Sequence, residues 1–130
     1  MIVVDASVMA SALGDDGQDG DRARQRLAGE RLFAPELIDL EVASVWRRAA
    51  RSGRLDDRRA GLALADLASM PLARASHRPL VARIWDLRAN LAPYDAAYVA
   101  LAELLDCVLV TADRGLGRAS GIECEVELLR

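Results

Sequence analysis

The chain contains no lysine: all 17 of its basic residues are arginine. This absence excludes mechanisms that depend on a lysine within the polypeptide, such as the P-loop of nucleotide-binding proteins and Schiff-base catalysis. It also excludes a phosphoacceptor receiver domain, which needs a lysine beside its paired acidic residues. Aromatic residues make up only 4% of the chain, so a base-stacking platform like that of single-strand-binding proteins is not expected.

Cysteine is scarce as well. Cys107 and Cys124 lie outside any CxxC motif and have no histidine at metal-ligand spacing. Neither a zinc site nor a redox motif is therefore expected, and we interpret both residues as buried, reduced thiols of a cytosolic protein. The chain shows no basic leader with a cleavage site, and no apolar run approaches the ~18 residues of a membrane span. We expect a soluble, cytoplasmic protein.

Length and charge limit the number of domains and the class of protein. The 130 residues suffice for one domain of ordinary size, ~100–200 residues, so residues 1–130 are predicted to form a single domain. A hydrophobic content of 52% excludes a disordered chain. The net charge of −3 argues against a protein that holds long nucleic acid by charge alone. It does not exclude a nuclease whose own carboxylates are neutralised by a metal.

Short apolar runs alternate with helical patterns along the chain. We expect strands at residues 2–4, 32–34, 72–75, 107–111 and 123–126. We expect helices at residues 7–13, 21–30, 36–52, 57–69, 79–88 and 94–105. The glycine-rich stretch at residues 14–20 is predicted to be a surface loop, with Asp19 or Asp21 capping the following helix. The alternation predicts a three-layer α/β/α fold with a mostly parallel sheet of about five strands.

Two aspartates follow predicted strands. Asp5 comes directly after residues 2–4, and Asp113 comes just after residues 107–111. In an open parallel sheet, ligands bind beyond the carboxyl ends of the strands, where the strand order reverses. The alternative for each residue is a helix N-cap, which is the commoner role of an aspartate at a strand-to-helix junction.

Two further carboxylates fall on inward-facing positions of predicted helices. Glu41 lies on the apolar stripe of the helix at 36–52, where a carboxylate is costly unless it is paired or bound to a cation. The alternative is a salt bridge to Arg48. Asp95 lies in the first turn of the helix after Pro93, where the helix dipole favours the ionised form that suits a metal ligand. Its alternative is an ordinary first-turn acid that complements the dipole.

Four acids at one end of a sheet would repel one another unless a cation lay between them. Mg²⁺ resolves this repulsion because it prefers oxygen ligands and takes a few carboxylates together with substrate phosphate oxygens. The chemistry that such a site implies is metal-assisted hydrolysis of a phosphodiester.

Four segments carry a recognisable pattern: IVVDASV at residues 2–8, ELIDLEVASVWRR at 36–48, NLAPYDAAYVALAE at 90–103 and TADR at 111–114. Together they resemble the PIN domain, and more narrowly the VapC toxins of bacterial toxin–antitoxin pairs. The resemblance covers nearly the whole chain, which implies a single PIN domain. It implies an endoribonuclease that depends on Mg²⁺ or Mn²⁺ and is neutralised by a cognate antitoxin protein. A homodimer and a toxin–antitoxin hetero-oligomer are implied as well.

The resemblance extends to single positions. The acidic quartet of the family is matched by Asp5, Glu41, Asp95 and Asp113. The resemblance implies that all four are catalytic and that Asp5, Asp95 and Asp113 hold the metal, Asp5 and Asp95 most directly.

Other positions match or depart from the family pattern. Ser7 and Thr111 match hydroxyl residues that support the quartet, and Asn90 matches a residue that flanks the pocket. Many relatives carry Thr or Ser where this chain has Ala92, so a helix cap is missing, although Pro93 presets the first turn. Some PIN domains also place an acid near the position of Gly115, and this chain does not.

The contacts with RNA and antitoxin leave alternatives open. Arginines in the segments 22–26 and 47–59 are suited to binding phosphates, or they form a solvated helix face. Residues 21–69 are suited to forming a groove for an antitoxin helix, or they pack as ordinary core. The competing functional class is a catalytically inactive PIN-like module that binds RNA or protein.

Overall fold

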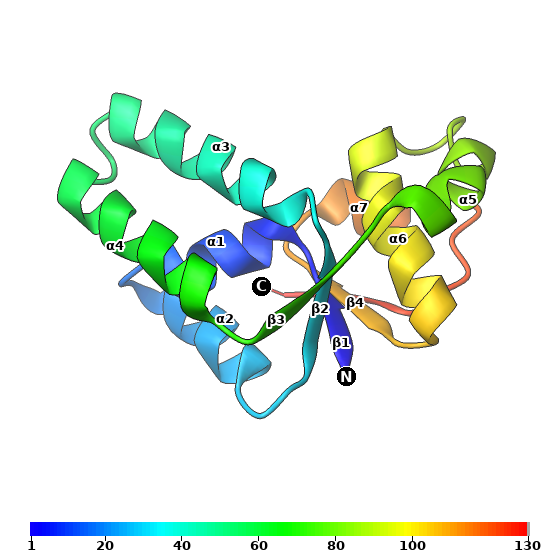
Figure 1. Ribbon diagram of the computed structural model, residues 1–130, viewed down its shortest axis with the longest axis horizontal. Helices are drawn as coiled ribbons and strands as arrows, with labels where there is room; N and C mark the ends of the chain where they lie inside the picture. Colours follow the sequence, from blue (N-terminus) through cyan, green and yellow to red (C-terminus); the bar gives the residue numbers. More distant parts are fainter. Residues whose placement is uncertain (130) are drawn as a thin grey trace.

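The computed structural model describes residues 1–129 and has a parallel β-sheet at its centre (Figure 1). The strands are β1 (Ile2–Val4), β2 (Leu32–Pro35), β3 (Leu72–Ala75), β4 (Val108–Thr111) and β5 (Val126–Leu128). Their order is β3-β2-β1-β4-β5, and all four neighbouring pairs are parallel. The expected parallel sheet of five strands is therefore confirmed.

Helices cover both faces of the sheet, which confirms the α/β prediction. The helices are α1 (Ala6–Gly14), α2 (Gln18–Leu27), α3 (Ile38–Arg51), α4 (Asp57–Ser69), the 3₁₀ helix η1 (Arg78–Leu80), α5 (Val81–Asp86), α6 (Pro93–Leu105) and α7 (Arg114–Arg118). Figure 1 shows α1 to α4 on one side of the strands and α5 and α6 on the other. Among residues 1–129, no helix is long and apolar enough to cross a membrane.

The core forms where the central strands meet α6. Val3 and Val4 of β1 and Leu109 and Val110 of β4 are fully buried, as expected for strands with helices on both faces. Every residue of α6 from Ala96 to Ala102 is buried as well. This apolar helix packs against β1, β2 and β4, so its first turn is held firmly at the carboxyl ends of these strands.

The connection between α1 and α2 is shorter than we expected. Helix α2 begins at Gln18 with Gly17 as its N-cap, and neither Asp19 nor Asp21 caps it. The Asp15 carboxylate accepts a hydrogen bond from the Gly17 N–H at 2.7 Å, which ends the loop early.

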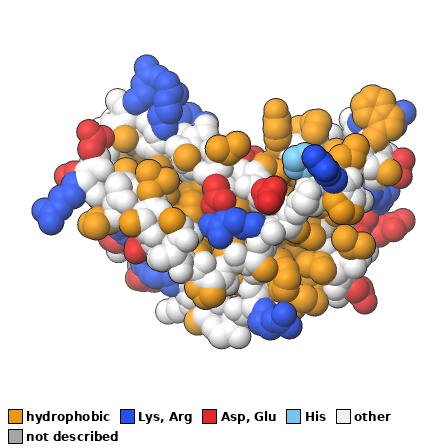
Figure 2. Space-filling model, viewed as in Figure 1, with side chains coloured by type: hydrophobic (Ala, Val, Ile, Leu, Met, Phe, Trp, Pro, Cys, Tyr) orange, Lys and Arg blue, Asp and Glu red, His pale blue; other side chains and the backbone are white. Residues whose placement is uncertain are grey.

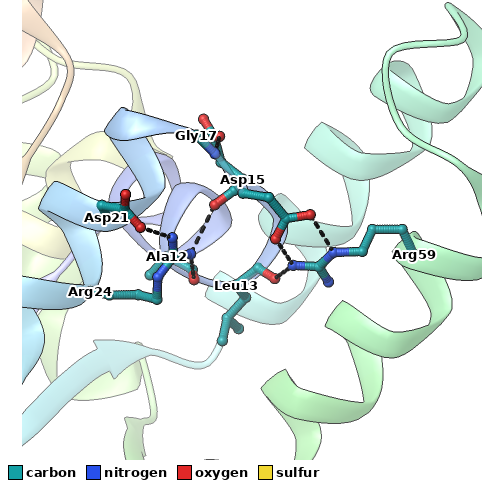
Figure 3. Close-up of polar contacts among 8 residues, drawn as sticks. Ala12, Leu13, Asp15, Gly17, Asp21, Arg24 and Arg59 are labelled. Atoms are coloured by element: carbon teal, nitrogen blue, oxygen red, sulfur yellow. Dashed lines mark hydrogen bonds and ion pairs between the residues drawn. The ribbon is translucent and has the colours of Figure 1, made fainter.

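Two arginines fasten this connection (Figure 3). Arg24 of α2 donates hydrogen bonds to the carbonyls of Ala12 and Asp15 at 2.9 and 2.8 Å. Arg59 of α4 donates to the carbonyl of Leu13 at 2.8 Å and pairs with the Asp16 carboxylate at 3.0 Å. Both guanidinium groups therefore serve the fold in this structure.

The last strand begins later than predicted. Residues 123–125 lie outside β5, because the Glu123 N–H donates to the Glu103 carboxylate at 3.1 Å instead of entering a ladder with β4. Pairing with β4 starts only where Leu109 meets Val126. The short helix α7 was not predicted, since five residues with two glycines carry no helical pattern.

Both cysteines are free thiols, as expected, but they are half-buried rather than fully enclosed. Burial raises the pKa of Cys124 to about 11 and also raises the pKa of Cys107. Both residues are therefore neutral thiols at physiological pH.

Candidate active site

The strand order reverses between β1 and β4, and two aspartates stand at that point. The chain places β2 and β3 on one side of β1 and then returns to place β4 and β5 on the other side. Asp5 directly follows β1, and Asp113 follows β4 by two residues. Open α/β sheets bind their ligands at this position, between two parallel neighbours from which the chain continues toward opposite edges of the sheet.

Asp5 is the most firmly held of the acidic residues. It is 7% exposed. Its Oδ1 accepts hydrogen bonds from the Ser7 hydroxyl at 2.6 Å and the Val8 N–H at 3.1 Å, and its Oδ2 accepts one from the Thr111 hydroxyl. Burial raises the pKa of Asp5, these hydrogen bonds oppose that rise, and the nearby Asp113 carboxylate adds to it. Asp5 also caps α1, so it serves both as an N-cap and as a wall of the site.

All four predicted acids line one cavity of about 340 Å³. Helix α3 contributes Glu41 and the first turn of α6 contributes Asp95, opposite the strand ends that carry Asp5 and Asp113. The remaining walls are formed by Ala6, Ser7, Ser44, Val45, Arg48 and Tyr98. The fold therefore brings together carboxylates that are up to 108 positions apart in sequence, counting from Asp5 to Asp113.

Glu41 contacts Tyr98 rather than Arg48. The Tyr98 hydroxyl donates a hydrogen bond to Glu41 Oε1 at 2.6 Å. Arg48 donates instead to the Ser44 hydroxyl at 3.0 Å and forms no ion pair with Glu41, so the salt-bridge alternative is wrong. Burial raises the pKa of Glu41, and the neighbouring Asp95 and Asp5 carboxylates raise it further.

Asp95 accepts no hydrogen bond from any group within residues 1–129. Burial raises its pKa, and the charges of Asp113 and Asp5 raise it further. We expected the helix N-terminus to favour the ionised form of Asp95. Desolvation and the neighbouring carboxylates outweigh that effect, because the Asp95 side chain lines the crowded cavity.

Comparisons with known proteins agree with this geometry. Residues 2–122 match the family model of the PIN domain. The chain is 46% identical over 129 residues to VapC ribonuclease Mb0985 of Mycobacterium bovis, an alignment that covers 99% of this chain and 98% of the relative. The chain belongs to the PIN-domain family. Within that family it groups with the VapC ribonucleases.

Solved structures share the fold. VapC20 of Mycobacterium tuberculosis, described as a toxin that cleaves the sarcin–ricin loop, superposes with a TM-score of 0.72 at 17% identity, covering 94% of this chain and 96% of that one. A toxin–antitoxin complex from Klebsiella pneumoniae superposes with a TM-score of 0.65 at 20% identity, covering 98% and 96%.

PIN-domain VapC ribonucleases are generally metal-dependent, and the oxygen donors of this cavity fit a hard divalent cation. Asp95 and the second oxygens of Glu41 and Asp113 carry no hydrogen bond from residues 1–129, so they are free to act as ligands. In their present positions, no three His, Cys, Asp or Glu side chains of the described chain stand close enough to hold an ion.

The supporting residues of this PIN domain take different places. Ser7 and Thr111 both bond to Asp5, as noted above. The Asn90 amide donates to the Ser120 carbonyl at 3.0 Å, and Asn90 does not line the cavity of the four acids. Ala92 occupies the N-cap position of α6, and its side chain makes no capping hydrogen bond, as the resemblance to the family implied.

Sequence reasoning missed one part of the PIN-domain site, the Tyr98 hydroxyl. Tyr98 shares a helix face with Asp95, three residues earlier, and it is the one residue with a polar tip on the buried stretch Ala96–Ala102. That polar tip was the available signal. Its partner could not be inferred, because Glu41 lies 57 positions away.

Proposed function

We propose that this protein is a Mg²⁺-dependent endoribonuclease that acts as the toxin of a toxin–antitoxin pair and hydrolyses phosphodiester bonds of RNA. The observation that carries this proposal is the set of four carboxylates around one cavity at the point where the strand order reverses. Membership of the VapC ribonucleases supplies the substrate class. Mn²⁺ is the alternative ion, because it accepts the same oxygen ligands.

In this proposal the four acids have distinct tasks. Asp5, Asp95 and Asp113 hold the metal, and Glu41 completes the catalytic quartet. When bound, the ion supplies charge stabilisation to the phosphate during an in-line displacement. Ser7 and Thr111 keep the Asp5 carboxylate in one orientation by donating to both of its oxygens.

Arg48 is the basic residue best placed to meet the substrate. Its side chain is exposed, it lines the acidic cavity, and it pairs with no carboxylate among residues 1–129. A guanidinium at this edge offers two parallel donors to a phosphate of the bound strand. We therefore propose that Arg48 contacts the RNA backbone beside the scissile bond.

The antitoxin is proposed to bind in the neighbouring groove. This groove, about 850 Å³ in volume, is lined by residues of α1, α3 and α4 and shares Ser7, Val45 and Arg48 with the acidic cavity. An antitoxin helix in the groove would reach the catalytic acids. A homodimer and a hetero-oligomer with the antitoxin belong to the same proposal.

Cleavage of RNA by the purified protein tests the enzymatic proposal. We expect a structured RNA to be cut with Mg²⁺ or Mn²⁺ and to stay intact with EDTA. We expect Asp5→Asn to abolish cutting, because it removes a metal ligand while keeping a side chain that can cap α1. Asp19→Asn is the matched control, since the Asp19 side chain is 74% exposed and pairs only loosely with Arg22, at 3.7 Å.

Full activity in EDTA would contradict the metal mechanism. Sequencing of the cut ends in total RNA after expression would name the target among transfer, ribosomal and messenger RNA. We expect expression of the protein to arrest growth, and relief of this arrest by co-expression of a small neighbouring open reading frame would test the antitoxin part separately.

The competing functional class is a catalytically inactive module that binds RNA or protein. If RNA binds equally well with and without divalent metal and is never cut, this second function is the correct one.

A further inference from the structure

Tyr98 joins the two helices that form opposite walls of the acidic cavity. Its side chain is buried in the core at 2% exposure, and its hydroxyl reaches Glu41 Oε1 at 2.6 Å. The bond connects α6 with α3 across 57 positions of sequence. No other hydrogen bond within residues 1–129 reaches the Glu41 carboxylate.

Glu41 needs such a restraint because its surroundings repel it. It is only half-buried, and the cavity it faces contains the carboxylates of Asp5 and Asp95. Like charges that share a cavity repel one another, and a long glutamate side chain can relieve the repulsion by turning towards solvent. The Tyr98 hydroxyl opposes that turn, since a hydrogen bond to a charged acceptor is among the stronger ones in proteins.

The Tyr98–Glu41 hydrogen bond ties Glu41 to a rigid part of α6. Tyr98 stands one helical turn after Asp95, on a stretch whose residues 96–102 are all buried. A buried helix is a rigid support. The hydroxyl therefore fixes Glu41 relative to Asp95, and Glu41 Oε2 is left without a hydrogen bond from residues 1–129.

We propose that Tyr98 is a positioning residue that holds Glu41 in the acidic cavity, where the free Oε2 of Glu41 adds to the three aspartate ligands, and that it thereby sets the affinity of the site for a divalent cation. This inference rests on the proposed function, because it concerns the same metal site. A purely structural Tyr98 would need only its ring, which phenylalanine supplies equally well. The hydroxyl is thus the group to test.

Titration of metal-free protein with Mn²⁺, followed by electron paramagnetic resonance without RNA, measures this role directly. We expect Tyr98→Phe to weaken Mn²⁺ binding by about 10- to 100-fold, the usual cost of removing a group that orients a site residue. In a Glu41→Ala background we expect Tyr98→Phe to change the affinity no further, because the hydroxyl would have lost its partner.

Tyr94→Phe is the matched control. Tyr94 lies on the same helix, is 65% exposed, and is the other tyrosine of the chain. We expect its Mn²⁺ affinity to equal that of the wild type. A thermal melt of each variant verifies folding, and a crystal structure of Tyr98→Phe would show whether Glu41 has turned out of the cavity.

Three results would overturn the proposal: unchanged Mn²⁺ affinity in Tyr98→Phe, equal weakening with and without Glu41, or a Glu41 side chain that keeps its place without the hydroxyl. Each of these leaves metal-dependent RNA cleavage by the wild type intact. A wild-type protein that binds no Mn²⁺ would instead remove the metal site itself, so the two failures are distinguishable.

Discussion

Single side chains at this site serve the fold and the chemistry together. Asp5 caps α1 through the Val8 N–H, and Asp113 caps α7 through the Gly115 N–H at 2.8 Å. Each keeps at least part of its carboxylate directed to the shared cavity. The N-cap and functional interpretations of these residues are therefore compatible, because a carboxylate has two oxygens and about four acceptor sites.

Asp95 offers a prediction about stability and pH. Its pKa is raised, so folding favours its protonated form, and ionisation of Asp95 weakens the native state. In EDTA, the cost is absent below the ordinary aspartate pKa of 3.8 and grows as pH rises through the higher folded-state pKa. We expect Asp95→Asn to stabilise the metal-free protein at pH 7 by about 0.5–2 kcal/mol and to lose RNA cleavage.

Urea unfolding of both proteins across the pH range measures the difference. Asp57→Asn is the control, because Asp57 is also a first-turn acid but lies exposed on α4. There we expect a small loss of stability, since the carboxylate complements the helix dipole without crowded neighbours. A destabilised Asp95→Asn protein at pH 7 would contradict the electrostatic account.

The residues of the site differ in how far sequence could predict them. Asp5 directly follows an apolar run and Asp113 follows one by two residues, so the rule for strand ends suffices to bring them together. The partner of Glu41 was not predictable: a helical wheel offers Arg48, about two turns away on the same helix, whereas the fold supplies Tyr98 from another helix. Local spacing constrains local pairs, and only the packing of α3 against the rest of the site selects the distant one.

At the scale of elements, the close approach of Gly20 to the preceding loop determines the geometry of the α1–α2 connection. A Cβ built at Gly20 would stand 1.8 Å from the Asp15 carbonyl oxygen, a distance that no real contact adopts. The first turn of α2 therefore lies directly against the loop, which explains why the helix starts before the aspartates that were expected to cap it. Gly61, in the middle of α4, has nothing within 4 Å of its Cβ position.

These two helical glycines give a paired prediction. We expect Gly20→Ala to destabilise the protein by about 1–3 kcal/mol, because the backbone must shift to admit a methyl group. We expect Gly61→Ala to stabilise it by about 0.5–1 kcal/mol, since alanine is the better helix former where space is open. Chemical denaturation of both variants checks the signs, and equal effects would contradict the close approach at Gly20.

Elements with strong local signals were predicted closely, and those determined by tertiary contacts were not. Helix α4 runs from Asp57 to Ser69 behind its Asp56 cap, and α6 begins at Pro93, both as expected. Strand β5 was misplaced because Glu123 bonds to α6. Helix α7 depends on the Asp113 cap, and its sequence carries no pattern of its own.

At the scale of the whole molecule, the charges are distributed unequally. Several arginines are occupied in ion pairs with acids that do not line the cavity, such as Arg74 with Asp39 at 2.7 Å and Arg83 with Glu103 at 2.7 Å. Figure 2 shows further arginine side chains gathered at the end of the α3–α4 hairpin away from the sheet. The four cavity acids form no ion pair within residues 1–129. The modest net charge of −3 thus conceals a concentrated negative site.

This distribution predicts that divalent metal stabilises the whole fold. An ion that binds only the native state contributes about 2.7 kcal/mol at one hundred times its dissociation constant, which raises the melting temperature by roughly 10 °C for a domain of this size. We expect this rise on adding Mn²⁺ or Mg²⁺ at pH 7. The rise should shrink as pH falls, because the raised pKa values of Asp5, Glu41 and Asp95 let protons compete with the metal closer to neutrality than ordinary carboxylates allow.

Differential scanning calorimetry of the wild type, Asp5→Asn and Asp19→Asn measures the effect. A rise of equal size in Asp5→Asn would place the stabilising ion elsewhere on the protein, whereas its loss in Asp5→Asn and retention in Asp19→Asn locates the ion among the four acids.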